Sequence, residues 1–356
     1  MSTPYQKLPD RSFWSRAISP SNFLSLKDVY QKKFDICADD KIVTAGSCFA
    51  QHIARHLQAK GYCYKDYEPK PPYLSQELAS SFNYGVYSAR YCNIYTARQL
   101  RQTFERAFGL REPSEDVWSC QDGYLDPFRP TVEPGPYQSV EEFAAARKTH
   151  LEAIRNVFTK SDIFIFTFGL TEAWQSKTDG SIFPVCPGTR APWNKEQTLG
   201  AFDSSKYEFK NFTFNEIISD FTWLIEQVRK INPSVRFLLT VSPVPLVATA
   251  TGKNVLTATM YSKSVLRAVA GDLSDNDNSI DYYPSYELVA SHPMRGAFFN
   301  PDLRTVALDG VEQVMKHFFR VHQLDNRKID NEEDEEEHTD IETVCEEMLQ
   351  DQGAEG

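Results

Sequence analysis

The sequence predicts an α/β fold, a three-layer α/β/α sandwich with a mostly parallel sheet and long loop insertions. Two nearly continuous apolar runs, at 161–168 and 235–241, are typical of strands that are buried on both faces. Segments with helical spacing of apolar residues alternate with these runs, as expected where crossover helices join parallel strands. The chain has 356 residues, of which 41% are hydrophobic, so it can bury a sizeable core.

The elements follow in order along the chain. Residues 1–35 are expected to form an N-terminal arm, residues 36–322 the α/β domain, and residues 323–356 an acidic tail. A first strand begins at Ile42 and leads through a Gly-Ser-Cys turn into a helix that ends near Ala59. Further helices are expected at 96–110, 139–158, 213–230, 257–271 and 307–319, a fourth strand at 280–283, and irregular insertions at 64–96, 111–137 and 176–212.

Charge and cysteine content exclude several classes of protein. Residues 326–356 carry 2 basic and 13 acidic side chains, which account for the whole net charge of −11, so the body is neutral. A neutral body argues against a general nucleic-acid surface, which requires clustered positive charge. The sequence contains no apolar run of about 18 residues and no secretory signal pattern. Its seven cysteines lack C-x-x-C spacing, so we expect a cytoplasmic location, reduced thiols, no metal site and no cofactor.

The acidic tail has two interpretations. Its acidic block is typical of disordered, self-repelling chain. Beyond that block, apolar residues recur at helical spacing, which leaves open either a solvated tail or a short helix that docks on a protein partner. These residues are Ile341, Val344, Cys345, Met348 and Leu349.

The turn at residues 46–48 is the strongest candidate for chemistry. Gly46 permits a sharp turn, Ser47 is a natural N-cap residue, and Cys48 falls in the first helical turn, where the helix dipole lowers a thiol pKa. His52 lies four residues further on, on the same helix face as Cys48. The alternative interpretation is that small residues serve only packing here and that Cys48 is a buried small hydrophobe.

Three other turns follow predicted strands and are expected to meet this one at the carboxyl edge of the sheet. Together they supply hydroxyl, carboxylate and backbone N–H groups suited to acyl transfer. Backbone N–H groups at Cys48 and near Gly169, with the Thr171 hydroxyl, are candidates for stabilising an oxyanion. The remaining candidate residues in these turns are Glu172, Ser242, Ser285, Tyr286 and Glu287.

Five motifs carry a resemblance to a known family. They are GSCFAQHI at 46–53, FTFGLTEAW at 166–174, LTVSPVPL at 239–246, YSKSVLR at 261–267 and YPSYE at 283–287. The chain resembles the GSCFA family over most of residues 35–322, and this family is distantly similar to the SGNH (GDSL-type) hydrolases and acyltransferases. The resemblance implies an SGNH-hydrolase-like, flavodoxin-like arrangement of the sheet.

The wider SGNH similarity also suggests roles for individual residues. It lays Gly46, Ser47 and Cys48 on the Gly-Asp-Ser block, so that Cys48 matches the nucleophilic serine. The Gly-x-Asn-Asp block falls on residues 169–172, where Thr171 replaces the oxyanion-hole asparagine.

The base of a catalytic triad is not determined by the sequence, because no Asp-x-x-His occurs after residue 280. His292 is the best-placed late histidine, although Val289 stands three residues before it. His52 is the local alternative, with Glu172 or Glu287 to orient it. The third alternative is that no triad exists.

These features predict a hydrolase or acyltransferase that cleaves or transfers an ester-type acyl group, such as an acetyl group on a glycan, with Cys48 or Ser47 as nucleophile. The alternative is a non-catalytic α/β module that binds a carbohydrate or a partner. A small-molecule or glycan ester, and a protein partner for the tail, are the expected ligands; nucleic acid and membrane are not.

Four further side chains have two interpretations each. Lys263 and Arg267 face either solvent or an anionic substrate. Trp174 and Trp193 either stack on a sugar or pack within loops that cover the core.

Overall fold

A parallel four-stranded sheet forms the centre of the computed structural model, which describes residues 3–322, 343 and 345–353. Its order is β1-β4-β10-β11, formed by Ile42–Gly46, Ile163–Phe168, Arg236–Val241 and Ile280–Tyr282. A parallel bridge from Ile42 to Tyr64 extends the free edge of β1. The chain therefore steps to one side of β1 before it crosses to β4 on the other side, which is the flavodoxin-like order with its switch point between β1 and β4.

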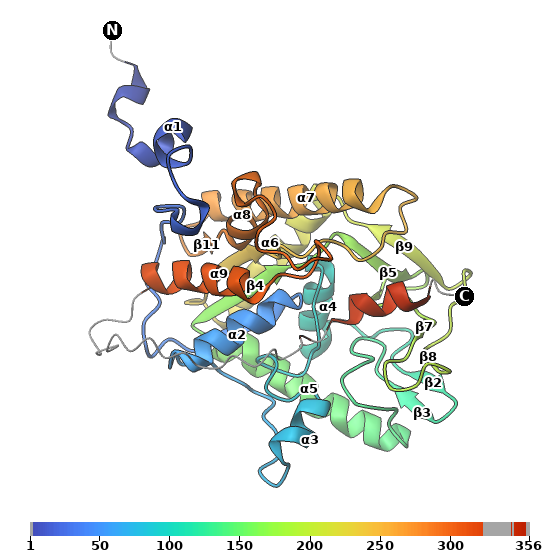
Figure 1. Cartoon of the computed structure of the whole chain (residues 1–356). Coiled ribbons are helices and arrows are strands. Elements are labelled where there is room, and N and C mark those ends of the chain that lie inside the picture. The colour runs from blue at the N-terminus through green and yellow to red at the C-terminus, as the bar shows by residue number, and fades with distance from the viewer. Residues whose placement is uncertain (1–2, 323–342, 344, 354–356) are drawn as a thin grey trace.

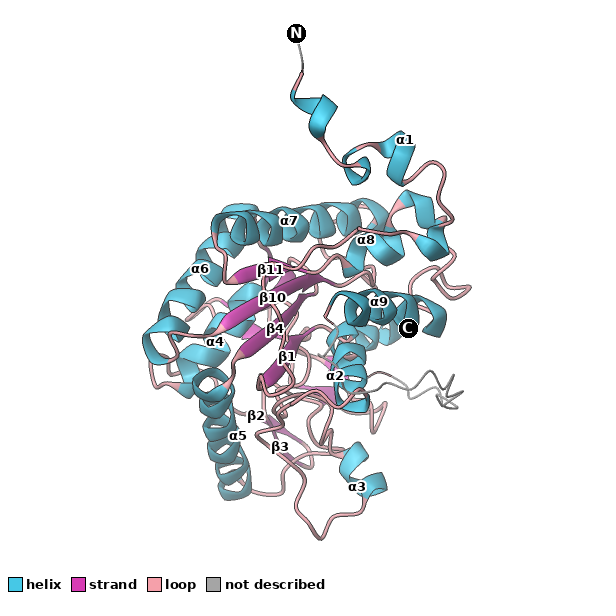
Figure 2. Cartoon of the chain, turned by 90° about the vertical axis from the view of Figure 1, so that its left-hand side faces the viewer, coloured by secondary structure: helices cyan, strands magenta, loops and turns pink. Residues whose placement is uncertain are grey.

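Helices cover both faces of this sheet, so the predicted three-layer sandwich is confirmed (Figure 2). Helices α2 (Phe49–Ala59), α8 (Ser285–Ala290) and α9 (Leu308–Val321) lie on one face. The opposite face carries α4 (Ala97–Ala107), α5 (Val140–Lys160), α6 (Phe214–Ile231) and α7 (Val255–Asn276). The expected end of α7 at Gly271 is wrong, because this glycine keeps a helical backbone and the following turn buries Leu273.

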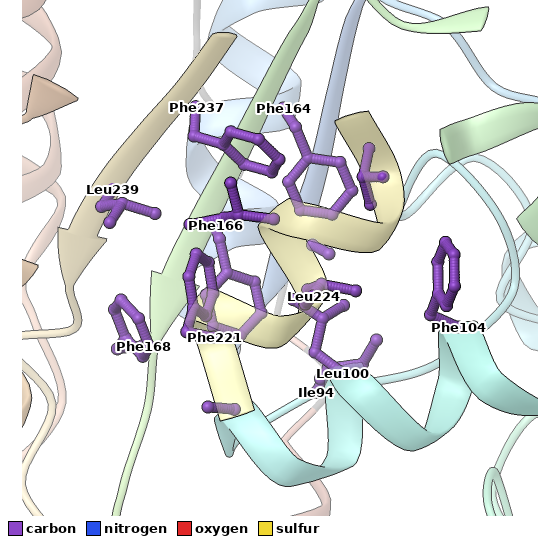
Figure 3. Close-up of a cluster of buried hydrophobic side chains, with 14 of the residues drawn as sticks. Ile94, Leu100, Phe104, Phe164, Phe166, Phe168, Phe221, Leu224, Phe237 and Leu239 are labelled. Carbon is purple, nitrogen blue, oxygen red and sulfur yellow. The ribbon is translucent and has the colours of Figure 1, made fainter. Parts of the chain in front are cut away.

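Aromatic side chains fill the larger of the two core layers (Figure 3). Phe164, Phe166 and Phe168 point from β4 toward α6, where Phe221 and Leu224 meet them. Because side chains alternate along a strand, the intervening Ile163 and Ile165 pack on the other face, against α2 and α9. β4 is buried along its whole length, which explains its continuous apolar sequence.

The insertions build a second, antiparallel layer beside the carboxyl edge of the sheet. The strands are β5 (Glu172–Ser176), β6 (Ile182–Phe183) and β9 (Tyr207–Asn211), together with the pairs β2 (Trp118–Cys120) with β3 (Gly123–Leu125) and β7 (Thr189–Arg190) with β8 (Thr198–Leu199). Residues 64–96 contain the short helix α3 (Gln76–Ser81), and Tyr87, Tyr91 and Tyr95 of this insertion are buried as packing residues. The sequence did not predict these short strands, because two to five residues carry little periodicity.

Both ends of the chain lie outside the sandwich but differ in their contacts. The N-terminal arm holds α1 (Trp14–Ala17) and 3₁₀ turns at Pro4–Lys7, Asp10–Ser12 and Phe23–Ser25, and it projects from the body (Figure 1). The C-terminal 3₁₀ helix η5 (Glu346–Gly353) instead packs on the body beside β7. The acidic block and residues Ile341 and Val344 lie outside the described residues. Within the described chain, no helix has the length and apolar character needed to cross a membrane.

Replacing Gly46 by alanine should destabilise the protein strongly. Gly46 has φ +142°, and an added Cβ would lie only 2.8 Å from the Thr167 backbone nitrogen and closer still to its carbonyl oxygen. We expect Gly46→Ala to lower the free energy of unfolding by about 3 kcal/mol or more in chemical denaturation. Gly61→Ala is the matched control, because Gly61 also has a positive φ of +73° but open space around it. Equal losses in both variants would contradict this assignment of the strain.

Candidate functional site

The Gly-Ser-Cys turn lies at the switch point of the sheet, held between β4 and the 92–95 segment. The Ser47 N–H donates to the Thr167 carbonyl at 3.1 Å, and the Ile94 N–H donates to the Gly46 carbonyl at 2.8 Å. A Cβ on Gly169 would lie 3.0 Å from the Cβ of Ser47. The turn and the bend at Gly169 are therefore in direct contact.

Cys48 stands at the N-terminus of α2, and both candidate nucleophiles are buried. The expectation that Ser47 caps this helix is wrong, because Cys48 occupies the N-cap position and makes no side-chain cap hydrogen bond. The Ser47 hydroxyl is 3% exposed and has no hydrogen-bond partner among the described residues. A buried hydroxyl without a partner is costly, so it indicates a position that a bound group or water completes.

The structure brings neither candidate histidine into a pair with Cys48. His292 begins the 3₁₀ turn His292–Met294, is exposed, and stacks on Trp14 of the N-terminal arm with ring centroids 5.1 Å apart. His52 lies in α2 beside the ring of Phe49. Burial, with the charges of Arg55 and His56, lowers its pKa to about 4, so His52 is neutral at physiological pH.

The bend at 169–172 does not offer the donors that the sequence suggested. The Gly169 N–H donates to the Tyr95 carbonyl at 3.0 Å. The Thr171 N–H donates to Ser262 Oγ at 3.0 Å, and its hydroxyl donates to Asn211 Oδ1 at 2.7 Å. Both residues position the bend, and their donors are already engaged, so the oxyanion role expected of them is not supported.

The remaining predicted residues divide between structural and cavity-lining positions. The Glu172 carboxylate accepts from Thr249 Oγ1 at 2.8 Å and lines a cavity, whereas Glu287 is paired with Arg267 at 2.6 Å. Ser242 Oγ accepts from the Val244 N–H, Ser285 shares a hydrogen bond with Thr240, and Tyr286 packs against the core. Neither glutamate is placed to orient an imidazole at Cys48.

Lys263, for which the sequence left open either solvent or an anionic substrate, is a functional candidate whose burial at the site the sequence did not predict. It is only 2% exposed, and its Nζ donates to the Gly169 carbonyl at 2.6 Å, directly beneath the bend. Burial lowers the Lys263 pKa to about 8, while the charges of Glu347 and Cys48 oppose that shift. Its spacing from Arg267 gave the only signal, and that signal did not distinguish a solvated lysine from a buried one.

The C-terminal segment covers this site. The thiols of Cys48 and Cys345 share a hydrogen bond. Glu346 and Glu347 follow, at 2% and 7% exposure, and Leu349 enters an apolar cluster of the antiparallel layer. The described part of the tail therefore docks on its own chain, in the place where the sequence left a protein partner open.

Each glutamate of the segment has its own set of donors. The Glu346 carboxylate accepts from the Tyr95 hydroxyl at 3.0 Å, from Thr131 Oγ1 at 3.1 Å and from the Asn93 amide. The Glu347 carboxylate accepts from the Val247 N–H at 2.7 Å and from Arg304 at 3.3 Å.

Two cavities flank the docked segment. The larger, of about 600 Å³, is lined by Glu172, Trp174 and Thr249 on the body and by Glu347 and Leu349 of the segment. The smaller, of about 350 Å³, is lined by Thr131, Trp193, Cys345, Glu346 and Leu349, among others. The segment therefore contributes residues to the walls of both cavities.

The docked segment also controls the charge state of Cys48. The hydrogen bond with Cys345 raises the pKa of Cys48, and burial and the negative charges of Cys345 and Glu347 raise it further. Arg304 acts in the opposite direction. Apart from burial, every cause that keeps Cys48 protonated comes from residues 345–347. In the part of the chain that the structure describes, no group of three or more His, Cys, Asp or Glu is arranged to hold a metal ion.

His52 should make the protein acid-sensitive. The unfolded chain binds a proton at His52 below about pH 6.5, whereas the native chain resists it until about pH 4, so stability falls as the pH falls through this window. His52→Gln should remove roughly 2 kcal/mol of the loss between these values, after allowance for partial exposure. Denaturant titrations at several pH values measure this, and parallel losses in both proteins would disprove it.

A comparison with family models identifies the chain. The GSCFA family model matches residues 41–318, which include β1, the GSC turn, Lys263, Arg304 and most of α9. No curated protein matches the sequence. Because the match covers most of the chain, including all four strands of the central sheet, the protein belongs to the GSCFA family.

Proposed function

We propose that this protein is an ester hydrolase or acyltransferase of SGNH-like type in which the Cys48 thiolate attacks the acyl carbonyl. The observation that supports this best is the placement of Cys48 at the N-terminus of α2, at the switch point of the sheet, where the buried Lys263 and the half-buried Arg304 interact with it electrostatically. Ligands of doubly wound sheets bind at such a switch point, and helix N-termini and cations favour a thiolate.

The chemistry needs a proton acceptor, and Lys263 suits that role better than either histidine. A lysine with a pKa of about 8 exchanges a proton readily near neutral pH. In the proposed step the neutral amine of Lys263 takes the Cys48 proton, and the ammonium that forms stabilises the thiolate. The sulfur then bonds to the carbonyl carbon, and the carbonyl oxygen becomes an oxyanion. Collapse then breaks the ester C–O bond, and the leaving alcohol takes the proton from Lys263. Water or an acceptor hydroxyl finally attacks the thioester and restores the thiol.

Groups that now bind the tail are suited to hold the oxyanion. The Asn93 amide and the hydroxyls of Tyr95 and Thr131 converge on the Glu346 carboxylate, whose oxygens stand in for those of a bound ligand. Preorganised donors of this kind stabilise charge that develops in the transition state. Their use for an oxyanion requires the segment to leave.

Ser47 is the weaker candidate for the nucleophile. Its hydroxyl lacks a hydrogen-bond partner, but its Cβ is in contact distance of Gly169, whereas Cys48 meets the segment that fills the cleft. The unpartnered Ser47 hydroxyl is better placed to contact a bound group than to attack one.

The cavity beside Glu172 suggests the character of the acyl group. Trp174, Phe202 and Phe209 line it, so it suits a compact apolar or aromatic group. The proposal puts the reaction in the cytoplasm, and the seven free cysteines are consistent with that reducing compartment.

A non-catalytic binding module is the second candidate. The specific observation in its favour is that the cleft already holds an acidic segment of the chain, while neither His52 nor His292 pairs with Cys48. In that case Cys48 would contact a ligand without bonding to it.

Trapping of an acyl-enzyme separates the two candidates. Full-length protein is incubated with p-nitrophenyl acetate, and modified residues are mapped by peptide mass spectrometry. We expect acetylation of Cys48 that is lost in Cys48→Ala and slowed about tenfold or more in Lys263→Met, because that variant lacks the proton acceptor. Ser47→Ala should keep the label.

Cys37→Ala is the matched control, because Cys37 is exposed and its acetylation reports only on surface thiols. The same reaction in Glu347→Gln shows whether the docked segment limits access. If the unchanged chain and Glu347→Gln are both folded and neither forms acetyl-Cys48, the result would contradict the proposal and favour the binding module.

A further inference from the structure

Residues 345–349 of the C-terminal segment make buried, specific contacts with the body, as a bound peptide ligand would. Glu346, Glu347 and Leu349 each enter a different part of the body, and both carboxylates are buried. Burying a carboxylate is costly unless donors or cations compensate it. A tail that merely rested on the surface would keep its carboxylates in water, so these contacts indicate specific recognition.

The first subsite is built from neutral donors, and Asn93 among them is held by side chains of the body. Asn93 is held by the Tyr87 hydroxyl, and Gln51 of α2 donates to both, at 2.9 Å to Tyr87 and 3.3 Å to Asn93. The preceding residue, Cys92, has a left-handed φ of +57° while buried, a strain that proteins retain where function requires it. This network connects the Glu346 carboxylate to the helix that carries Cys48.

The second subsite supplies positive charge. Arg304 and the Val247 N–H hold the Glu347 carboxylate. Burial raises the pKa of Glu347, and Arg304, the Val247 N–H and the charge of Lys263 oppose that shift. Among the residues that the structure describes, no carboxylate of the body forms an ion pair with Lys263, whose Nζ instead donates to the Gly169 carbonyl. A lysine buried without such a partner is costly, and a second, anionic group reduces that cost.

From these contacts we infer that the groove over Cys48 is a binding site for an acidic peptide with the pattern Glu-Glu-x-Leu. The chain's own residues 345–349 occupy this site as an intramolecular competitor and close Cys48. The inference goes beyond acyl transfer and does not require it, because recognition and access are both non-covalent. Displacement of the segment would remove Leu349, which lines both flanking cavities.

The first test measures access to Cys48 in full-length protein. Iodoacetamide alkylation of Cys48 is followed by peptide mass spectrometry in the unchanged chain and in Glu346→Gln/Glu347→Gln. We expect the double variant to be alkylated about tenfold faster or more, because it loses charge-assisted hydrogen bonds in both subsites. Asp351→Asn is the matched control, since Asp351 lies in the same helix but is exposed, and its rate should be unchanged.

The second test measures recognition of the segment in trans. A fluorescein-labelled peptide of residues 345–353 is titrated into each full-length protein, and binding is read by fluorescence anisotropy. The double variant should bind the peptide about tenfold more tightly or better than the unchanged chain, because its own segment no longer competes. Adding Arg304→Gln should weaken that binding, and a peptide with glutamine at both glutamate positions should bind poorly.

Equal alkylation rates in the unchanged chain and the double variant would overturn the inference, as would failure of the double variant to bind the peptide. Protection of Cys48 that grows with protein concentration would show that a second copy supplies the segment, and would overturn the intramolecular form. None of these readouts needs acyl-transfer activity, so failure of acetyl-Cys48 to form leaves them unaffected.

Discussion

The close approach of Gly46 to Thr167 on β4 is the constraint on which the site depends. With no side chain at Gly46, β1 can turn away from the sheet against β4 and start α2 two residues after Ser47, at Phe49. A larger residue would push the turn outward and separate Cys48 from the bend at Gly169. The position of Cys48 therefore depends first on a steric requirement of the backbone at Gly46.

Charged groups of both signs act on Cys48, the proposed nucleophile. Lys263 and Arg304 favour an anion near Cys48, yet Glu347 of the docked segment neutralises them. The same cations serve the thiolate or the carboxylate, and they do not serve both equally well at once. Under the proposed function, access to Cys48 and its activation are coupled for this reason, because the contacts that cover Cys48 also raise the pKa of its thiol.

The sequence predicted the framework of the site better than its chemistry. Continuous apolar strands such as β4 and a short turn before α2 leave patterns that are local, so their placement at one sheet edge followed from the fold class. Lys263 could not be identified in this way, because a lysine within an amphipathic helix has the same spacing whether its Nζ reaches solvent or a carbonyl. His292 was chosen by its position late in the chain, and the stacking with Trp14 that fixes it elsewhere is a contact between distant segments. The partners of Glu346 likewise lie more than 200 residues away, beyond any local pattern.

The most direct test of the account is the pH dependence of Cys48 alkylation in a full-length chain whose segment has been released by Glu346→Gln/Glu347→Gln. The account predicts that the apparent pKa of Cys48 is lower in this protein than in the unchanged chain, and that adding Lys263→Met raises it again. An apparent pKa that is the same in all three proteins would contradict the claim that buried cations at the switch point activate this thiol.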